Sequence, residues 1–379
     1  MNKNYIHALA TLVGYIIGVG MFGLPFLIIK AGLWPCLALI AVIGVVQYYV
    51  HLIYAGIIAD TPGYHRTPGY AERYLGRGGK HFAFFAQTIG NYGAMLAYMI
   101  VGGLFSYQLF SPIFGGSEFF YTTAFYLIMS LVVLMGLKTI ARVELILTLG
   151  LLAAILVITK IGAQYVSLDN YTLINWKYAL LPYGAILFAF DGGGAIPIVA
   201  EIVKKDKKLL KKAVAWGTII SIAVVTFFAV VVAGITGPMT TPDALEGLWN
   251  VLDGKVIRVS LVFGLLVIAT SFFGVAQCIK ETFCWDYKIN PAVAFVLALV
   301  LPFLMYLAGL NNFISIIGFA GAVSGGLSGI VLIMIFRKME KKQKKLSLFK
   351  HKPSLIFLSL IFILFTAGIA YEIWYFLAH

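Results

Sequence analysis

The stretch from Gly14 to Phe26 reads GYIIGVGMFGLPF, and the stretch from Phe188 to Glu201 reads FAFDGGGAIPIVAE. Each places a cluster of glycines inside a long apolar run, and each has a proline a few residues later. Glycine provides no side chain for packing and proline removes a hydrogen-bond donor, so both residues weaken a helix locally. The two stretches therefore predict two helices that are interrupted near their centres.

The rest of the chain is strongly apolar. Of its 379 residues, 61% are hydrophobic and only 11% are charged, and the mean hydropathy is +0.96. A soluble domain of this size could not cover itself with polar side chains. The charges gather in short clusters between apolar runs, which is typical of a multi-pass protein of the cytoplasmic (inner) membrane. The lipid bilayer is thus an expected partner.

A helix needs about 20 apolar residues to cross the hydrocarbon layer. Eleven segments meet this requirement, and the interrupted stretches fall in the first and the sixth. Because the two breaks lie five helices apart, an odd number, the second set of five starts from the opposite side of the membrane. The sequence predicts an all-α membrane domain in which residues 5–162 and 177–336 form a 5+5 inverted repeat and 353–377 hold an extra C-terminal helix. The segments are Ala8–Ile29, Leu33–Ala59, Phe82–Phe110, Phe119–Leu137, Val143–Ile161, Tyr178–Val203, Ala213–Ile235, Val256–Phe283, Pro291–Leu310, Phe313–Phe336 and Leu355–Leu377.

The basic residues predict the orientation. Placing the N-terminus in the cytoplasm leaves only five of the 28 Lys and Arg residues at the outer ends of helices. Cytoplasmic loops carry an excess of Lys and Arg, so we expect a cytoplasmic N-terminus and an extracytoplasmic C-terminus. The same clustering accounts for the net charge of +13 without any nucleic-acid partner. The inner segment Asp60–Lys80 contains TPGY twice and is expected to be a turn-rich loop that serves as a gate or a partner surface.

A broken helix exposes N–H groups on one half and C=O groups on the other. The first suit a carboxylate, and the second suit an ammonium group or an alkali cation. A zwitterion uses both, so the pattern favours an α-amino acid. We therefore expect a secondary transporter that works by alternating access. No cofactor is expected beyond a coupling ion, which the sequence leaves open between Na⁺ and H⁺.

The same residues resemble a known family. IGVGMFGLP at Ile17–Pro25 is similar to the IGxGMxxxP signature of the amino acid/auxin permease branch of the amino acid–polyamine–organocation superfamily. Leu181-Pro182 with Phe188, Phe190 and Gly194–Pro197 resembles the pattern of its sixth helix, and ATSFFGV at Ala269–Val275 resembles the tyrosine permeases. These three motifs span most of the chain. The resemblance to the hydroxy and aromatic amino acid permeases implies a LeuT-like fold and cation-coupled symport of neutral or aromatic amino acids.

Two positions depart from that pattern. Asp191 stands where these permeases usually have a small residue, and Gly193 stands where the tyrosine permeases tend to have histidine. An ionisable group at the centre of a membrane helix is costly and is a functional hypothesis by default. Asp191 is therefore a candidate for binding the substrate amine or a coupling cation, or for carrying a coupling proton. The alternative is that it caps the second half of its helix.

The candidate site combines the two breaks with polar groups that the resemblance places beside them. Thr270 and Ser271 offer hydroxyl oxygens of the kind that sodium prefers, although such hydroxyls also bond back to their own helix. The expected substrate-binding residues are Ile17, Gly18, Val19, Gly20, Tyr98, Phe190, Asp191, Gly192 and Gly193. The expected coupling-ion residues are Ile16, Gly18, Asp191, Thr270 and Ser271, with no other metal site and no catalytic residue.

Other classes of function are less well supported. A non-transporting amino acid sensor of the same fold, or a transporter of another small amine, remains open. An enzyme is not expected, because there is no HExxH motif and no paired aspartates or Ser/His pair in facing helices. A nucleotide-binding motif is also missing from the sequence. A monomer is the expected state, with the amino acid as its small-molecule partner.

Overall fold

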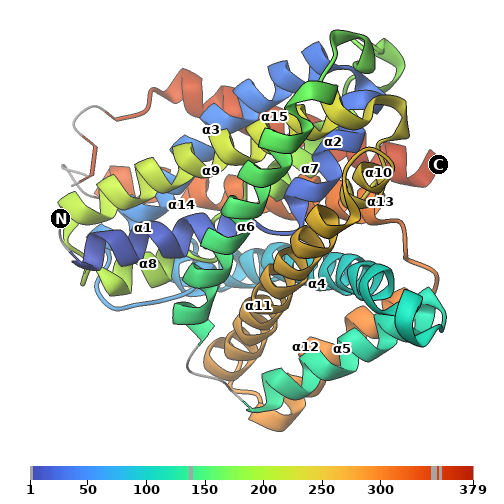
Figure 1. Cartoon of the computed structure of the whole chain (residues 1–379). Coiled ribbons are helices and arrows are strands. Elements are labelled where there is room, and N and C mark those ends of the chain that lie inside the picture. The colour runs from blue at the N-terminus through green and yellow to red at the C-terminus, as the bar shows by residue number, and fades with distance from the viewer. Residues whose placement is uncertain (1–2, 136–139, 343–347, 350–351, 379) are drawn as a thin grey trace.

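The computed structural model describes residues 3–135, 140–342, 348–349 and 352–378, and this part of the chain contains helices, turns and loops but no β-strand (Figure 1). The helices of the first half are α1 (Lys3–Ile16), α2 (Gly20–Ala31), α3 (Leu33–Asp60), α4 (Thr67–Phe114), α5 (Glu118–Met135) and α6 (Ile140–Gly162). Those of the second half are α7 (Pro182–Ala189), α8 (Ile196–Ile202), α9 (Lys207–Thr236), α10 (Leu245–Trp249), α11 (Gly254–Asp286), α12 (Pro291–Leu307), α13 (Phe313–Phe319), α14 (Gly326–Lys342) and α15 (Leu355–Ala378). A π-helical turn, Ala320–Gly325, joins α13 to α14.

Each of the eleven predicted spans coincides with one helix or with a broken pair. Seven helices of the described chain are long and apolar enough to cross a membrane, or eight when the bent pair α1 and α2 counts as one span. The sixth predicted span consists of α7 and α8, which have only 8 and 7 residues. Neither helix alone is long enough to cross a membrane. The all-helical architecture is therefore confirmed, whereas the count of eleven spans stays a prediction.

The segment Asp60–Lys80 differs from the expectation of a loop. Helix α4 begins at Thr67 with Pro68 in its first turn, where proline's missing N–H is no loss. The first part of α4 meets the membrane-length part at Gly76, whose φ of 80° is a conformation that glycine adopts readily. Only residues 61–66 form the connection, so the turn residues here start a helix that then kinks.

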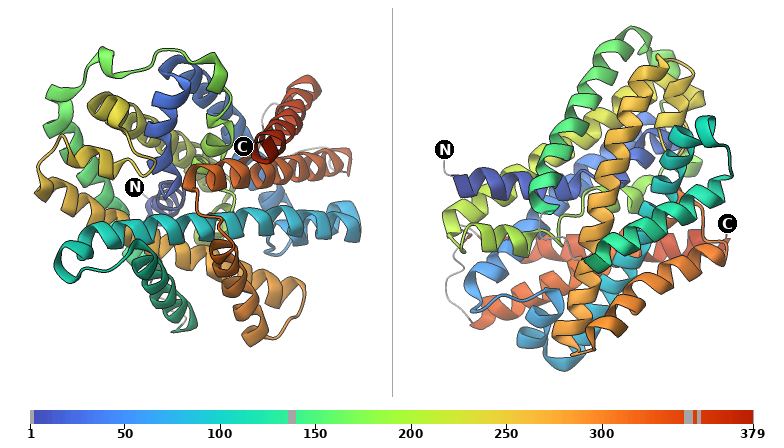
Figure 2. Two further views of the ribbon diagram at one scale, coloured as in Figure 1. Left: turned by 90° about the vertical axis from the view of Figure 1, so that its right-hand side faces the viewer. Right: turned by 60° about the horizontal axis from the view of Figure 1, so that its bottom comes forward.

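The helices form two packed groups (Figures 1 and 2). In the first, α1, α2 and α3 pack against α7, α8 and α9. In the second, α4, α5 and α12 pack around α11, with α6 on its other side. The segment from α13 to α14 contacts both α7 of the first group and α4 of the second. Both broken helices thus lie in the first group, and the second group faces them through α4 and α11.

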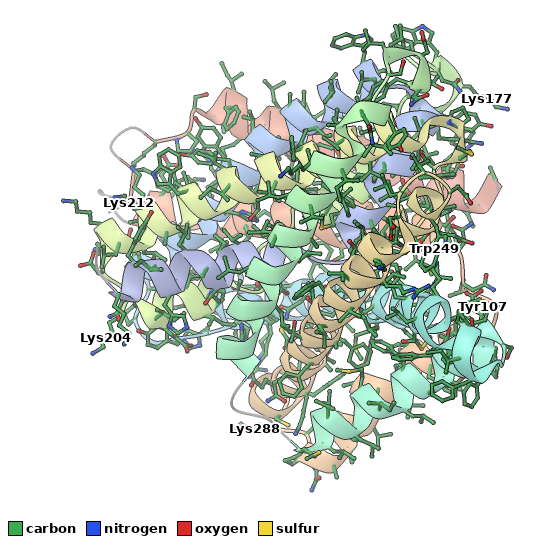
Figure 3. All side chains as sticks on the ribbon, viewed as in Figure 1. Tyr107, Lys177, Lys204, Lys212, Trp249 and Lys288 are labelled. Carbon is green, nitrogen blue, oxygen red and sulfur yellow. The ribbon has the colours of Figure 1, made fainter. Side chains whose placement is uncertain are left out.

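The two ends of the molecule differ in charge. Lys204 and Lys212 lie at the left of Figure 3 and Lys288 at its bottom, whereas Lys177 lies at the upper right. The N- and C-termini also lie at opposite ends (Figure 1). This separation agrees with the segregation of basic residues in the sequence. Which end faces the cytoplasm remains a prediction from the positive-inside rule.

Candidate functional site

The first break lies between α1 and α2, whose axes differ by 50°. Three residues form it, and short-range bonds hold them: Gly18 N–H donates to Ile16 C=O at 2.9 Å and Phe22 N–H donates to Val19 C=O at 3.1 Å. A side chain at Gly18 would begin 3.7 Å from Tyr98 Oη and 3.8 Å from Ser271 Oγ. The break therefore faces α4 through Tyr98 and α11 through Ser271.

The second break is the linker of residues 190–195 between α7 and α8. Gly193 N–H donates to Asp191 Oδ1 at 2.9 Å, and Gly192 N–H donates to Nε2 of His51 at 3.1 Å. The residue at the N-cap of α8 is Ala195, so Asp191 closes a turn inside the linker and does not cap α8. Its carboxyl nevertheless stays exposed to a cavity. The capping alternative is therefore wrong: Asp191 accepts a hydrogen bond within the linker, and it borders the cavity.

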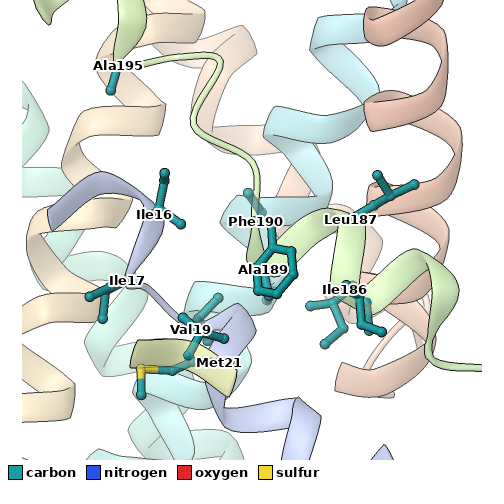
Figure 4. Packing of buried hydrophobic residues seen from close by; sticks show 14 of the residues in the cluster. Ile16, Ile17, Val19, Met21, Ile186, Leu187, Ala189, Phe190 and Ala195 are labelled. Carbon is teal, nitrogen blue, oxygen red and sulfur yellow. The ribbon is translucent and has the colours of Figure 1, made fainter. Parts of the chain in front are cut away.

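The two breaks meet at Gly20. A Cβ atom there would lie 2.8 Å from the Cα atom of Ala189, at the end of α7, which is closer than side chains pack. Figure 4 shows Val19 of the first break beside Ala189 and Phe190. Close backbone approach of this kind requires glycine, and it sets the start of α2 against the end of α7.

A cavity of about 110 Å³ lies between the breaks, α3, α4, α11 and the π-helical turn. A water molecule needs only about 10–15 Å³ by the same measure, so the space admits a small solute or several waters. The only Asp, Glu, Lys or Arg side chains on its wall, within the described chain, are Asp191 and Arg66. The uncharged polar groups of the wall include Gln47, Asn91 and Ser324.

The predicted site residues divide into two sets. Those on the cavity wall are Ile16, Gly18, Val19, Gly20, Tyr98, Asp191 and Gly193. Those not on it are Ile17, Phe190, Gly192, Thr270 and Ser271. Phe190 is fully buried in the core, and Phe188, two residues earlier, lies on the wall instead. Thr270 Oγ1 donates to Val267 C=O at 2.9 Å, which is the alternative of bonding back to its own helix.

His51 of α3 is a site residue that the sequence reading missed. Its side chain is 1% exposed and bridges two elements: Nε2 accepts from Gly192 N–H, and Nδ1 lies 2.9 Å from Thr218 Oγ1 of α9. A signal existed, because His51 lies deep inside the apolar run Leu33–Asp60. An ionisable residue at such a position is a functional candidate by default.

Arg66 is a second missed residue, and it lies in the connection between α3 and α4. Its Nη2 is 3.3 Å from Glu281 Oε2 of α11, and its Nη1 donates to Gly194 C=O of the linker at 3.2 Å. Gln277 also donates to Glu281 at 2.9 Å. One guanidinium thus joins a break in the first helix group to α11 of the second, at the wall of the cavity. Residues so far apart in the chain give no local sequence signal.

Comparisons with known proteins agree with this architecture. The sequence matches the tryptophan/tyrosine permease family over residues 1–373. It is 24% identical to tyrosine-specific transport system 1 of Haemophilus influenzae over 350 residues, which cover 85% of this chain and 84% of that protein. It is 20% identical to glutamine transporter 2 of Aliivibrio fischeri over 353 residues, covering 90% and 91%.

Solved structures share the fold at low identity. The inward-facing structure of Mhp1 superposes with a TM-score of 0.67 at 14% identity, covering 97% of this chain and 88% of Mhp1. MhsT in complex with L-phenylalanine superposes with a TM-score of 0.61 at 14% identity, covering 98% of both chains. These are transporters of the LeuT-like fold, which confirms the fold that the family resemblance implied. With its family match spanning nearly the whole chain, this protein belongs to the tryptophan/tyrosine permease family.

Proposed function

We propose that this protein is a cation-coupled secondary transporter that binds one neutral amino acid in the cavity between its two helix breaks. The observation that carries the proposal is Asp191, whose carboxylate faces the cavity from the middle of a broken helix. An α-ammonium group is the partner such a carboxylate needs in a membrane interior. The half-helix α2 begins at Gly20, which also borders the cavity, and the positive end of its dipole suits the substrate carboxylate.

The charge on the cavity wall favours a neutral side chain on the substrate. Arg66 is already paired with Glu281, so Asp191 is left as the one carboxylate for the ammonium group. Phe188 offers an apolar contact, and Gln47, Asn91 and Ser324 offer hydrogen bonds. Such a wall suits a side chain with both apolar and polar parts. Tyrosine and glutamine, after which the two relatives are named, are the first substrates to test.

The function is tested by ligand-induced stabilisation followed by flux. The purified protein is screened for a thermal shift with tyrosine, tryptophan, phenylalanine and glutamine, and it is then reconstituted into liposomes for counterflow of the ligand that stabilises it. Stabilisation together with counterflow supports the proposal. Stabilisation without counterflow points to a sensor. Equal stabilisation by tyrosine and by its decarboxylated analogue tyramine points to a transporter of amines, and no shift with any amino acid refutes the proposal.

The ion pair between Arg66 and Glu281 acts in this proposal as a gate on the side of the α3–α4 connection. Replacing Glu281 by glutamine is expected to shift the equilibrium between the closed and the open form of that side toward the open form by about 1 kcal/mol, because a half-buried ion pair of this kind contributes about that much. Cys278 lies on the cavity wall and reports the opening. In a Cys284→Ser background, we expect a thiol reagent to alkylate Cys278 about fivefold faster in Glu281→Gln than in the parent.

The matched control for this gate is Glu72→Gln. Glu72 pairs with Lys80 at 2.9 Å on the same helix α4 but does not lie on the cavity wall. Loss of the Glu72–Lys80 ion pair is expected to leave the alkylation rate of Cys278 unchanged. The Cys278→Ser variant confirms which thiol reacts. An alkylation rate in Glu281→Gln equal to that of the parent would refute the gate.

A further inference from the structure

The hydrogen bonds of His51 determine which of its nitrogens carries the proton. A backbone N–H can only donate, so Nε2, which receives Gly192 N–H at 3.1 Å, must use its lone pair and carries no hydrogen. A neutral imidazole then has its hydrogen on Nδ1, from which it donates to Thr218 Oγ1 at 2.9 Å. In the structure described here, His51 is therefore neutral and both of its nitrogens are occupied.

A second proton can enter this ring only at Nε2. In the imidazolium form both nitrogens are donors, so Nε2–H and Gly192 N–H would point at each other. Gly192 must then turn away, and with it the linker of residues 190–195 that carries Asp191. The proton adds to the ring lone pair without breaking a covalent bond, and one hydrogen bond is lost. The present arrangement of the linker and a proton on Nε2 exclude each other.

We propose that His51 is a proton-binding site whose occupancy controls the linker of residues 190–195 and that it carries the coupling proton of transport. Its role in transport rests on the proposed function, whereas the link between proton and linker stands on the geometry alone. A movement that takes Gly192 away from Nε2 admits a proton. The return of Gly192 expels it, so a cycle that moves the linker once also moves one proton.

The surroundings provide acceptors and charges that act on this site. The ionisable groups on the same cavity wall are Tyr15 of α1, Tyr54 of α3, Arg66 of the α3–α4 connection, Tyr98 of α4, Asp191 of the linker and Cys278 of α11. Asp191 directly precedes Gly192, so its carboxylate is the acceptor that a released linker brings to an imidazolium. Arg66 opposes the added charge, but its pairing with Glu281 reduces this effect.

Hydrogen–deuterium exchange tests the link without any substrate. The exchange of a peptide that covers residues 190–195 is measured between about pH 5 and pH 8, where histidine titrates, and is corrected for intrinsic exchange. In the wild-type protein we expect the corrected rate to rise on acidification by up to about tenfold per pH unit. In His51→Gln the amide oxygen still accepts from Gly192 N–H but takes no proton in this range, so the rate is expected not to change with pH.

A peptide that covers the first break, residues 17–19, is the internal control and is expected to respond less. Thr218→Val is the second variant: it keeps the bond from Gly192 to His51 and must therefore keep a pH dependence, even with a shifted midpoint. Protection of residues 190–195 that does not depend on pH in the wild type overturns the proposal. So does a pH dependence that persists unchanged in His51→Gln.

The role in coupling is tested by flux. Two quantities are measured in liposomes with labelled tyrosine or glutamine: its accumulation driven by an imposed pH gradient, and its rate of counterflow without a gradient. Their ratio reports coupling to protons separately from transport itself. We expect this ratio to fall at least about tenfold in His51→Gln, since a site without a titratable group cannot use the gradient. A ratio equal to that of the wild type would refute the coupling role. If the wild-type protein transports no amino acid, the proposed function is refuted. The hydrogen–deuterium exchange result for His51 would still hold.

Discussion

The Asp191→Asn variant is expected to bind its amino acid at least about thirtyfold more weakly than the wild-type protein. Removing one partner of a desolvated charge pair costs about 2 kcal/mol or more, which corresponds to that factor. Asparagine keeps an Oδ1 that accepts from Gly193 N–H, as Asp191 does at 2.9 Å. The substitution thus removes the charge and leaves the turn, so a loss of affinity reports the contact with the ammonium group. The dissociation constant is measured by equilibrium binding of labelled tyrosine or glutamine.

Two controls make this prediction specific. Asp60→Asn removes another carboxylate, which pairs with Lys207 at 3.2 Å and does not lie on the cavity wall, and it is expected to leave the affinity unchanged. A probe without the α-ammonium group, such as the deaminated analogue of the substrate, is expected to bind wild type and Asp191→Asn with similar weak affinity. An unchanged dissociation constant for the amino acid in Asp191→Asn would show that the substrate amine binds elsewhere.

The Gly184→Ala variant is expected to lose about 3 kcal/mol of stability, the upper end of what overpacking usually costs, or to fail to accumulate in the membrane. A Cβ atom on Gly184 of α7 would overlap the backbone carbonyl of Gly318 in α13. Backbone cannot rotate away as a side chain can, so the two helices must move apart. Gly318 has no room to retreat, because Glu372 of α15 approaches it from another side, with Oε1 2.6 Å from the position of its Cβ. Thermal unfolding in detergent measures the loss.

The matched control is Gly274→Ala on α11. Nothing lies within 4 Å of a Cβ atom at that glycine, and alanine is a better helix former than glycine. We therefore expect Gly274→Ala to be neutral or slightly stabilising. A Gly184→Ala protein that unfolds at the wild-type temperature would show that α7 and α13 pack less tightly than described.

The positions of the two breaks could be predicted from the sequence because their cause is local. Glycine at residues 18 and 20 and at 192–194 weakens the helix regardless of which other helices pack against it. The structure confirms interruptions at residues 17–19 and 190–195, and Asp191 and Gly18 border the same cavity. The same two stretches, together with ATSFFGV at Ala269–Val275, carry the resemblance that implied an amino acid permease of the LeuT-like fold, and the solved transporter structures confirm that fold.

The directions in which side chains near the breaks point could not be predicted from the sequence. Phe190 and Phe188 lie two residues apart at the end of α7, which is a rotation of about 200° around a helix. One of them is buried in the core and the other lies on the cavity wall, and only the packing of α7 against its neighbours decides which. The sequence also could not show whether the Thr270 hydroxyl binds an ion or its own helix, because a backbone carbonyl one turn away is always available as an acceptor.

By itself, the sequence determined where the helices break, that the chain is a membrane protein, and that an acid lies at the second break. Only the tertiary structure decided what surrounds that acid. His51 reaches Gly192 across 141 positions of the chain, and Arg66 reaches Gly194 across 128. Helix interruption is a property of local backbone chemistry, whereas a hydrogen bond between distant segments exists only after the helices have packed.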